Sequence, residues 1–227
     1  GASDAVRDLA QEILATGSLG YTEAMGSPAL RRAIAAHYGR WYGADVDPSR
    51  VAVTTGSSGG FMLAFLAAFD PGARVAIARP GYPCYRNVLA ALGCTVVEVP
   101  TGPDTRFQPT PELLEQAHAR APLDGLVVAS PANPTGTMLQ PAELAAIARW
   151  CADNDVQLVS DEIYHGIQYG ARAVSALEVS DEVYVINSFS KYFSMTGWRV
   201  GVAIAEPEIL EVMSNINNSL IYTAPSI

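Results

Sequence analysis

Short apolar runs rich in β-branched residues alternate along the chain with longer segments in which apolar residues recur at helical spacing. The runs that we expect to form strands are Val51–Thr55, Arg74–Ala78, Thr95–Val99, Gly125–Ala129, Val156–Ser160, Glu182–Asn187 and Arg199–Ala205. Strands that alternate with helices usually pair in parallel and are covered on both faces. The pattern therefore predicts a three-layer α/β/α sandwich with a mostly parallel sheet of about seven strands.

Two helices are expected before the first strand, and a buried one after it. Ser27 followed by Pro28 is typical of an N-cap with proline in the first helical turn. Phe61–Phe69 is apolar on nearly every side, which is typical of a buried helix. The segment Ser3–Thr16 carries its apolar residues on one helical face: Val6, Leu9, Ile13 and Leu14.

The composition of the chain limits the binding partners and the cellular location that we expect. The 227 residues include 23 acidic and 14 basic ones, giving a net charge of −9, and no Lys/Arg-rich run occurs. We therefore expect neither nucleic acid nor an anionic membrane surface as a partner. No apolar run approaches the roughly 18–20 residues of a membrane span, and no signal peptide is recognisable, so a cytoplasmic location is expected. Three scattered cysteines and three distant histidines suggest reduced thiols and no metal site.

Polar loops follow five of the predicted strands. These loops are Thr55–Gly60, Pro80–Tyr82, Pro131–Asn133, the turn at Asp161, and Ser188–Lys191. In open α/β sheets the ligand crevice lies beyond the carboxyl ends of the strands. Five unrelated polar loops at one edge of the sheet therefore predict a ligand site there.

The loop Gly56–Gly60 leads into a helix and offers backbone N–H groups, two hydroxyls and the positive end of a helix dipole. These features suit a phosphate. The loop matches neither the Walker pattern nor G-x-G-x-x-G, so ATP and NAD are poorly supported. Arg199 has the fork geometry that a phosphate dianion accepts. A plain strand-to-helix turn and a surface arginine are the alternatives.

Lys191 is the single lysine of the chain, whereas the other thirteen basic residues are arginine. Lysine offers an amine that can lose its proton and attack a carbonyl. A phosphate, such an amine and a carboxylate together describe pyridoxal phosphate, whose ring nitrogen stays protonated beside a buried carboxylate. Asp161 fits that role, unless it only caps the following turn. A stray surface lysine is the alternative for Lys191.

Three further side chains have suitable positions for such a cofactor. Tyr164 and Asn133 could hydrogen-bond the ring oxygen from two sides, and Tyr82 could stack on the ring face. Asn133 precedes a proline and is equally typical of a turn. Tyr82, beside Gly81 and Pro83, is equally typical of simple packing.

Four motifs carry a resemblance to a known family: Ser188–Lys191 with Met195–Gly201, Asn133–Gly136, Asp161–Tyr164 and Pro80–Pro83. In order and spacing the chain resembles the large, cofactor-binding domain of the fold-type I pyridoxal-phosphate aminotransferases of class I/II. The resemblance implies that Lys191 holds the cofactor as an internal aldimine and moves the proton between the substrate α-carbon and cofactor C4′. It further implies that Asp161 pairs with the pyridinium nitrogen.

The same resemblance implies roles for the remaining site residues. Asn133 and Tyr164 would bind the ring oxygen, and Tyr82 would stack on the ring. Tyr21 would reach the phosphate of a neighbouring subunit, which implies a homodimer with shared active sites. The phosphate would be held by Gly56, Ser57, Ser58, Ser188 and Arg199.

We expect residues 1–227 to form one large domain. By the resemblance, an N-terminal arm and a C-terminal small domain, the latter after a segment such as Thr223–Ile227, would lie outside this chain. The small domain carries the arginine that binds the substrate α-carboxylate, so the chain alone is expected to be a poor transaminase. The expected reaction is transamination between an amino acid and a 2-oxo acid. The alternatives are C–S β-elimination and a ligand-sensing domain of a regulator, and the substrates are left open.

Overall fold

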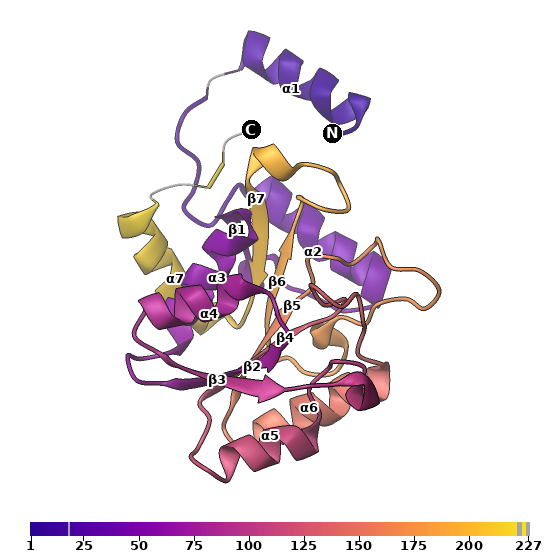
Figure 1. Cartoon of the computed structure of the whole chain (residues 1–227). Coiled ribbons are helices and arrows are strands. Elements are labelled where there is room, and N and C mark those ends of the chain that lie inside the picture. Colours follow the sequence, from indigo (N-terminus) through magenta and orange to yellow (C-terminus); the bar gives the residue numbers. More distant parts are fainter. Residues whose placement is uncertain (18, 222–223, 226–227) are drawn as a thin grey trace.

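The structure, a computed structural model, describes residues 1–17, 19–221 and 224–225. Thr223, Ser226 and Ile227 of the expected C-terminal boundary segment lie outside the described residues. The described residues form one seven-stranded sheet, which confirms the predicted architecture (Figure 1). Its strands are β1 (Val51–Thr55), β2 (Arg74–Arg79), β3 (Thr95–Pro100), β4 (Gly125–Ala129), β5 (Gln157–Asp161), β6 (Tyr184–Ser188) and β7 (Val200–Ile204).

The strand order is β1-β7-β6-β5-β4-β2-β3. Strands β3, β2, β4, β5 and β6 pair in parallel, whereas β7 runs antiparallel to both of its neighbours, β1 and β6. Every residue of β7 is buried, as expected for an apolar strand in the middle of a covered sheet. The carboxyl ends of β1, β2, β4, β5 and β6 therefore share one edge of the sheet.

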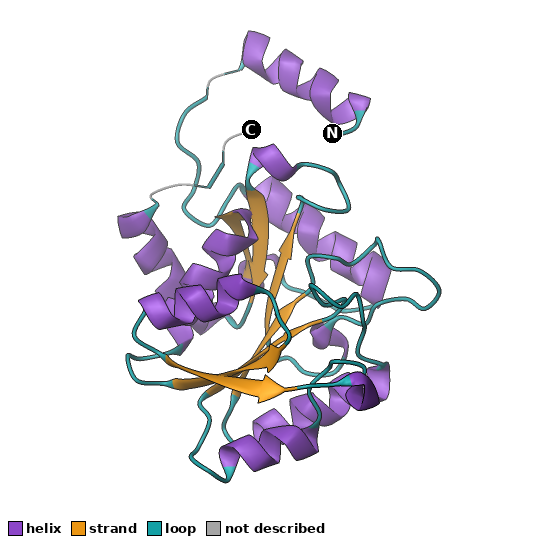
Figure 2. Ribbon diagram, viewed as in Figure 1, coloured by secondary structure: helices purple, strands orange, loops and turns teal. Residues whose placement is uncertain are grey.

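Helices cover both faces of the sheet (Figure 2). One face packs on α3 (Gly56–Ala68), α4 (Pro83–Ala91) and α7 (Pro207–Leu220), through a core that includes Phe61, Phe65, Leu89 and Met213. The other face packs on α2 (Pro28–Tyr42), α5 (Pro111–His118) and α6 (Pro141–Asp153), through Tyr38, Leu114, Leu144 and Ile147. Within the described part of the chain, the short 3₁₀ helices are η1 (Pro48–Arg50), η2 (Pro103–Thr105), η3 (Ala176–Glu178) and η4 (Thr196–Trp198).

Helix α1 (Asp4–Thr16) forms as its periodicity predicts, but it lies apart from the sheet (Figure 1). Leu9 and Leu14 on its apolar face are 57% and 59% exposed, and Ala10 is its buried residue. The apolar face therefore contributes little to the core of this chain. None of the helices formed by the described residues combines the length and the apolar composition that a bilayer crossing requires.

The start of α3 differs from the sequence prediction. Glycine and serine are poor helix formers, so the pattern places the helix start at Phe61, yet the helix begins at Gly56. The approach of α3 to the sheet explains the glycines, because a Cβ on Gly60 would lie 3.3 Å from Ile186 Cγ2. As a result, Ser57 and Ser58 lie in the first turn of α3.

Candidate active site

A cavity of about 280 Å³ opens at the edge of the sheet where the five strands end. Most of the predicted site residues line it: Ser57, Ser58, Tyr82, Asn133, Asp161, Tyr164, Lys191 and Arg199. These residues come from five segments that are distant in sequence and meet because their strands are parallel or adjacent. The predicted convergence of the polar loops is thus present in the fold.

One part of the cavity combines groups that attract an anion. Arg199 lies over the first residue of α3, so closely that a Cβ on Gly56 would be 2.2 Å from Arg199 Nη2. Gly56 also has a φ of +69°, a conformation that favours glycine. Arg199 donates to the Thr196 carbonyl at 3.2 Å and, within the described part of the chain, pairs with no carboxylate. Its positive charge, two serine hydroxyls and the α3 amino terminus form an anion subsite.

Asp161, the last residue of β5, is buried in the cavity wall with 4% of its surface exposed. Its Oδ1 accepts the Ile163 N–H at 3.0 Å, and its Oδ2 accepts the Tyr85 hydroxyl. Burial raises the pKa of Asp161 to about 6, although both hydrogen bonds oppose that rise. No lysine or arginine among the described residues pairs with it. A cationic group that enters the cavity would therefore stabilise the ionised carboxylate.

Lys191, Tyr164 and Asn133 line the same cavity as these two charged groups. Lys191 Nζ lies 5.8 Å from the centroid of the Tyr164 ring. Burial raises the pKa of Tyr164, and a side-chain hydrogen bond to Asn133 opposes that rise. The Tyr164 phenol is therefore protonated near neutral pH. It and the Asn133 amide are two donors for an oxygen atom of a ligand.

A family model described as aminotransferase class I and II matches residues 2–227. This chain belongs to that family. Valine–pyruvate aminotransferase of Mycobacterium tuberculosis is 60% identical over 203 residues, a match that covers 88% of this chain and 52% of that protein. Aspartate/prephenate aminotransferase of Thermus thermophilus is 36% identical over 214 residues, which cover 94% of this chain and 55% of that protein. The chain thus spans about half the length of the curated relatives that it matches.

Solved aminotransferase structures share the fold. An aminotransferase from Mycobacterium tuberculosis superposes with a TM-score of 0.95 at 52% identity, covering 100% of this chain and 62% of that one. Aspartate aminotransferase from Thermus thermophilus with maleate gives a TM-score of 0.95 at 34% identity, covering 99% of this chain and 59% of that one. The sheet and helices described above are therefore those of an aminotransferase.

Three residues that the aminotransferase resemblance singles out lie outside the cavity lining. Gly56 lies beneath Arg199, and its contribution is the close approach of the backbone. Ser188 is buried, its Oγ accepts the Ser190 N–H at 2.8 Å, and it lines a neighbouring apolar cavity. Tyr21, 82% exposed, lies on the segment before α2. The predicted phosphate contacts of Ser188 and Tyr21 stay predictions.

The cavity also contains residues that the sequence pattern did not single out: Phe61, Cys84, Tyr85, Ile163, Ser190 and Thr196. Tyr85 matters most among them, because its hydroxyl donates to Asp161. A signal was available, since Tyr85 follows Tyr82, the N-cap residue of α4, by three residues and lies in the first turn of that helix. The side chain that orients Asp161 thus comes from a helix that the loop motif Pro80–Pro83 begins.

Proposed function

We propose that this chain forms the pyridoxal-phosphate-binding large domain of an aminotransferase that transfers an amino group between an amino acid and a 2-oxo acid. The observation that carries the proposal is one cavity that combines the anion subsite at Arg199, the amine of Lys191 and the buried carboxylate of Asp161. A guanidinium, an amine and a carboxylate are the side-chain groups that suit a phosphate, an aldehyde and a pyridine nitrogen.

The donor set fits the cofactor group by group. Arg199, Ser57 and Ser58 would hold the phosphate at the amino terminus of α3. The Lys191 amine would bond to the aldehyde carbon with loss of water, and Asp161 would accept a hydrogen bond from the protonated ring nitrogen. The ring oxygen would be held by Asn133 and Tyr164, with Tyr82 against the ring face. When bound, this group supplies an electron sink that stabilises negative charge at the substrate α-carbon.

The residues of the chain supply orientation and proton transfer. Asp161 is fixed by the Ile163 N–H and the Tyr85 hydroxyl, and its carboxylate would favour the protonated, cationic form of the ring nitrogen. Lys191 carries the only side-chain amine, and once released from the cofactor it can move a proton at the substrate α-carbon. Phe61 and Ile163 contribute apolar surface to the cavity wall.

The donor that we propose first is valine, with pyruvate as acceptor. The support is the Mycobacterium tuberculosis relative, a valine–pyruvate aminotransferase that is 60% identical over 203 residues. The proposal includes a cytoplasmic homodimer in which Tyr21 reaches the partner's phosphate site. Its exposed position outside its own cavity supports that arrangement. The three cysteines form no disulfide, which suits a reducing compartment.

The test is an amino-transfer assay of the protein supplied with pyridoxal phosphate, valine and pyruvate. We expect alanine to form only when both substrates are present, and Lys191→Ala to lower the rate at least about 100-fold. Elimination would instead release pyruvate and ammonia from a cysteine conjugate without a 2-oxo acid, and a ligand sensor would bind without forming product. A full amino-acid screen in which no donor yields a new amino acid, even at the low rate expected of this chain, would overturn the proposal.

A further inference from the structure

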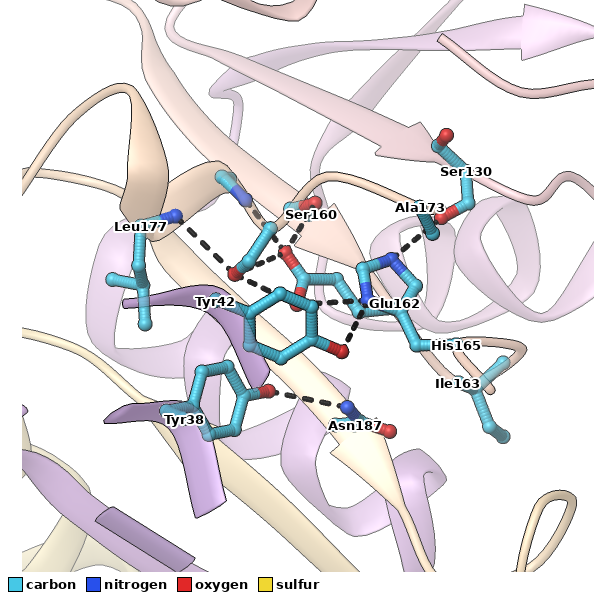
Figure 3. A network of polar contacts seen from close by, with 12 residues as sticks. Tyr38, Tyr42, Ser130, Ser160, Glu162, Ile163, His165, Ala173, Leu177 and Asn187 are labelled. Carbon is cyan, nitrogen blue, oxygen red and sulfur yellow. Dashed lines mark hydrogen bonds and ion pairs between the residues drawn. The ribbon is translucent and has the colours of Figure 1, made fainter. Parts of the chain in front are cut away.

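The two donors proposed for the ring oxygen come from separate segments, Asn133 from the loop after β4 and Tyr164 from the turn after β5. His165 follows Tyr164 on the turn after β5, and its side chain reaches Ser130, the first residue of the loop after β4 (Figure 3). Its Nε2 lies 2.9 Å from the Ser130 carbonyl oxygen, and its Nδ1 lies 2.8 Å from Tyr42 Oη. His165 is 5% exposed and does not line the cavity, so its part is to hold other residues in place.

The hydrogen-bond partners of His165 determine which nitrogen of its imidazole carries the proton. A carbonyl oxygen only accepts, so Nε2 must carry the proton, and the unprotonated Nδ1 then accepts the Tyr42 hydroxyl. Burial lowers the pKa of His165 to about 4, so the ring is neutral near pH 7 and this tautomer is the one that satisfies both bonds. His165 therefore bridges two groups: it accepts a hydrogen bond from the Tyr42 hydroxyl and donates one to the Ser130 carbonyl.

Ser130 connects the bridge to the loop that carries Asn133. Its N–H donates to the Asp161 carbonyl at 3.2 Å, and its Oγ accepts the Leu139 N–H at 2.9 Å. The residue thus ties the start of the loop to β5 and closes the loop at its far end. Since Asn133 is three residues after Ser130 and Tyr164 directly precedes His165, moving the bridge would move both donors.

Further contacts hold the Tyr42 end of the bridge and the segment that follows the turn. The Arg172 guanidinium lies 5.7 Å from the centroid of the Tyr42 ring and pairs with Glu178 at 2.8 Å. Glu162, fully buried, accepts the Ala176 N–H at 2.7 Å and so holds the segment after the turn. The titratable and charged groups around the imidazole are Asp161 and Glu162 on its own turn, Tyr42 from α2, and Arg172 and Glu178 from the following segment.

We propose that His165 is a positioning residue of the cofactor site. By joining Tyr42 to the Ser130 carbonyl, it holds Asn133 and Tyr164 at the separation at which both can donate to one cofactor oxygen. This inference rests on the proposed cofactor. Those two hydrogen bonds favour the ionised ring oxygen, so they set the pH at which the visible spectrum of the bound cofactor changes.

The first variant is His165→Leu, which leaves the Ser130 carbonyl and the Tyr42 hydroxyl without their partner. We expect the spectral midpoint to rise by about one pH unit, and the dissociation constant for pyridoxal phosphate to rise about tenfold. Tyr42→Phe removes one hydroxyl and should shift both quantities in the same direction, but less. His165→Gln, whose amide N–H can still reach Ser130, should restore most of the midpoint.

Tyr184→Phe is the matched control, because Tyr184 is a tyrosine of the core that lies at the opposite end of β6 from the cavity. Its midpoint and affinity should equal those of the unmutated protein. A folded His165→Leu protein with unchanged midpoint and affinity would overturn the inference. If His165→Leu does not fold, Tyr42→Phe tests the inference in its place. A spectral midpoint of Tyr42→Phe equal to that of Tyr184→Phe would then overturn the inference. An unmutated protein that gains no visible band with the cofactor overturns the proposed function itself, which is a distinguishable result.

Discussion

Asp161 and Glu162 are consecutive buried carboxyl residues with different surroundings. Asp161 faces the cavity and accepts hydrogen bonds from Tyr85 and the Ile163 backbone, and burial raises its pKa to about 6. Glu162 points to the other side of the turn, toward Ser175 and Ala176, and burial raises its pKa to about 8. At neutral pH, Asp161 is therefore available as an anion for a cationic ligand, whereas Glu162 is largely protonated and holds the backbone.

The raised pKa of Glu162 predicts a pH dependence of stability. In the unfolded chain this group titrates at its ordinary value of 4.5, and in the folded protein at about 8. Between these values the folded state keeps a proton that the unfolded state has lost. Its contribution to the free energy of unfolding therefore falls as pH rises, by about 1.4 kcal/mol per pH unit.

Glu162→Gln cannot titrate, so it should lack this contribution. We expect the stability of the variant relative to the unmutated protein to increase steadily from about pH 5 to about pH 8 in denaturant unfolding. The comparison cancels the titration of Asp161 and His165, which both proteins share. Two parallel stability profiles across this range would show that Glu162 does not hold a proton in the folded state.

At the scale of elements, the amino terminus of α3 and the residue before β7 form the anion subsite together. Gly56 begins α3 and Arg199 precedes β7, and each has a positive φ. The two segments touch, because a Cβ on Gly201 would lie 2.3 Å from the Gly56 carbonyl carbon. The subsite therefore depends on backbone geometry that the side-chain pattern of the sequence does not show.

Gly56→Ala tests this contact. Its Cβ would meet the Arg199 guanidinium, and alanine at positive φ costs about 1–2 kcal/mol. We expect a lower melting temperature and an affinity for pyridoxal phosphate reduced at least about tenfold. Gly197→Ala is the control, since a Cβ there meets nothing within 4 Å. Equal cofactor affinities of the two variants in a titration would contradict the assignment of the subsite.

The sequence predicts helices and strands correctly where the conformational preferences of neighbouring residues determine them. β-branched runs located the seven strands, and Pro28 after Ser27 located α2, whose N-cap hydroxyl accepts the Leu30 N–H at 3.3 Å. The start of α3 was placed five residues late, at Phe61 in place of Gly56. Packing against the sheet overrides the low helix propensity of Gly and Ser there, and no local pattern records that packing.

At the scale of the whole molecule, the sequence predicted which residues meet at one cavity but not the contacts among them. Motifs at the strand ends predicted that Lys191, Asp161 and Arg199 lie together, because parallel strands bring such loops together. The antiparallel insertion of β7 between β1 and β6, and the bridge from Tyr42 through His165, depend on which distant segments meet. Such pairings follow from tertiary packing and have no signal within one segment.

The cavity also limits what this chain can do by itself. Among the described residues that line it, Arg199 is the sole arginine, and we propose that it binds the phosphate. A substrate α-carboxylate would lack a bidentate partner there, which corresponds to a loss of about 100-fold in turnover.

We therefore expect the 227-residue chain to bind pyridoxal phosphate but to transaminate valine and pyruvate at least about 100-fold more slowly than the Mycobacterium tuberculosis relative assayed beside it. The measurement is kcat/KM for both proteins, with cofactor occupancy determined separately. A kcat/KM within tenfold of the relative would show that this cavity already holds the substrate carboxylate.

The covalent attachment of the cofactor to Lys191 is the central claim, and borohydride reduction tests it most directly. Lys191 is the single lysine, so the chain offers no other side-chain amine for attachment. The protein is mixed with pyridoxal phosphate, reduced, digested and analysed by mass spectrometry, beside Lys191→Ala treated in the same way. We predict one added cofactor mass, located on the peptide that contains Lys191, and none in the variant. A protein that gains no cofactor mass, or a variant that gains as much as the unmutated chain, would contradict the claim.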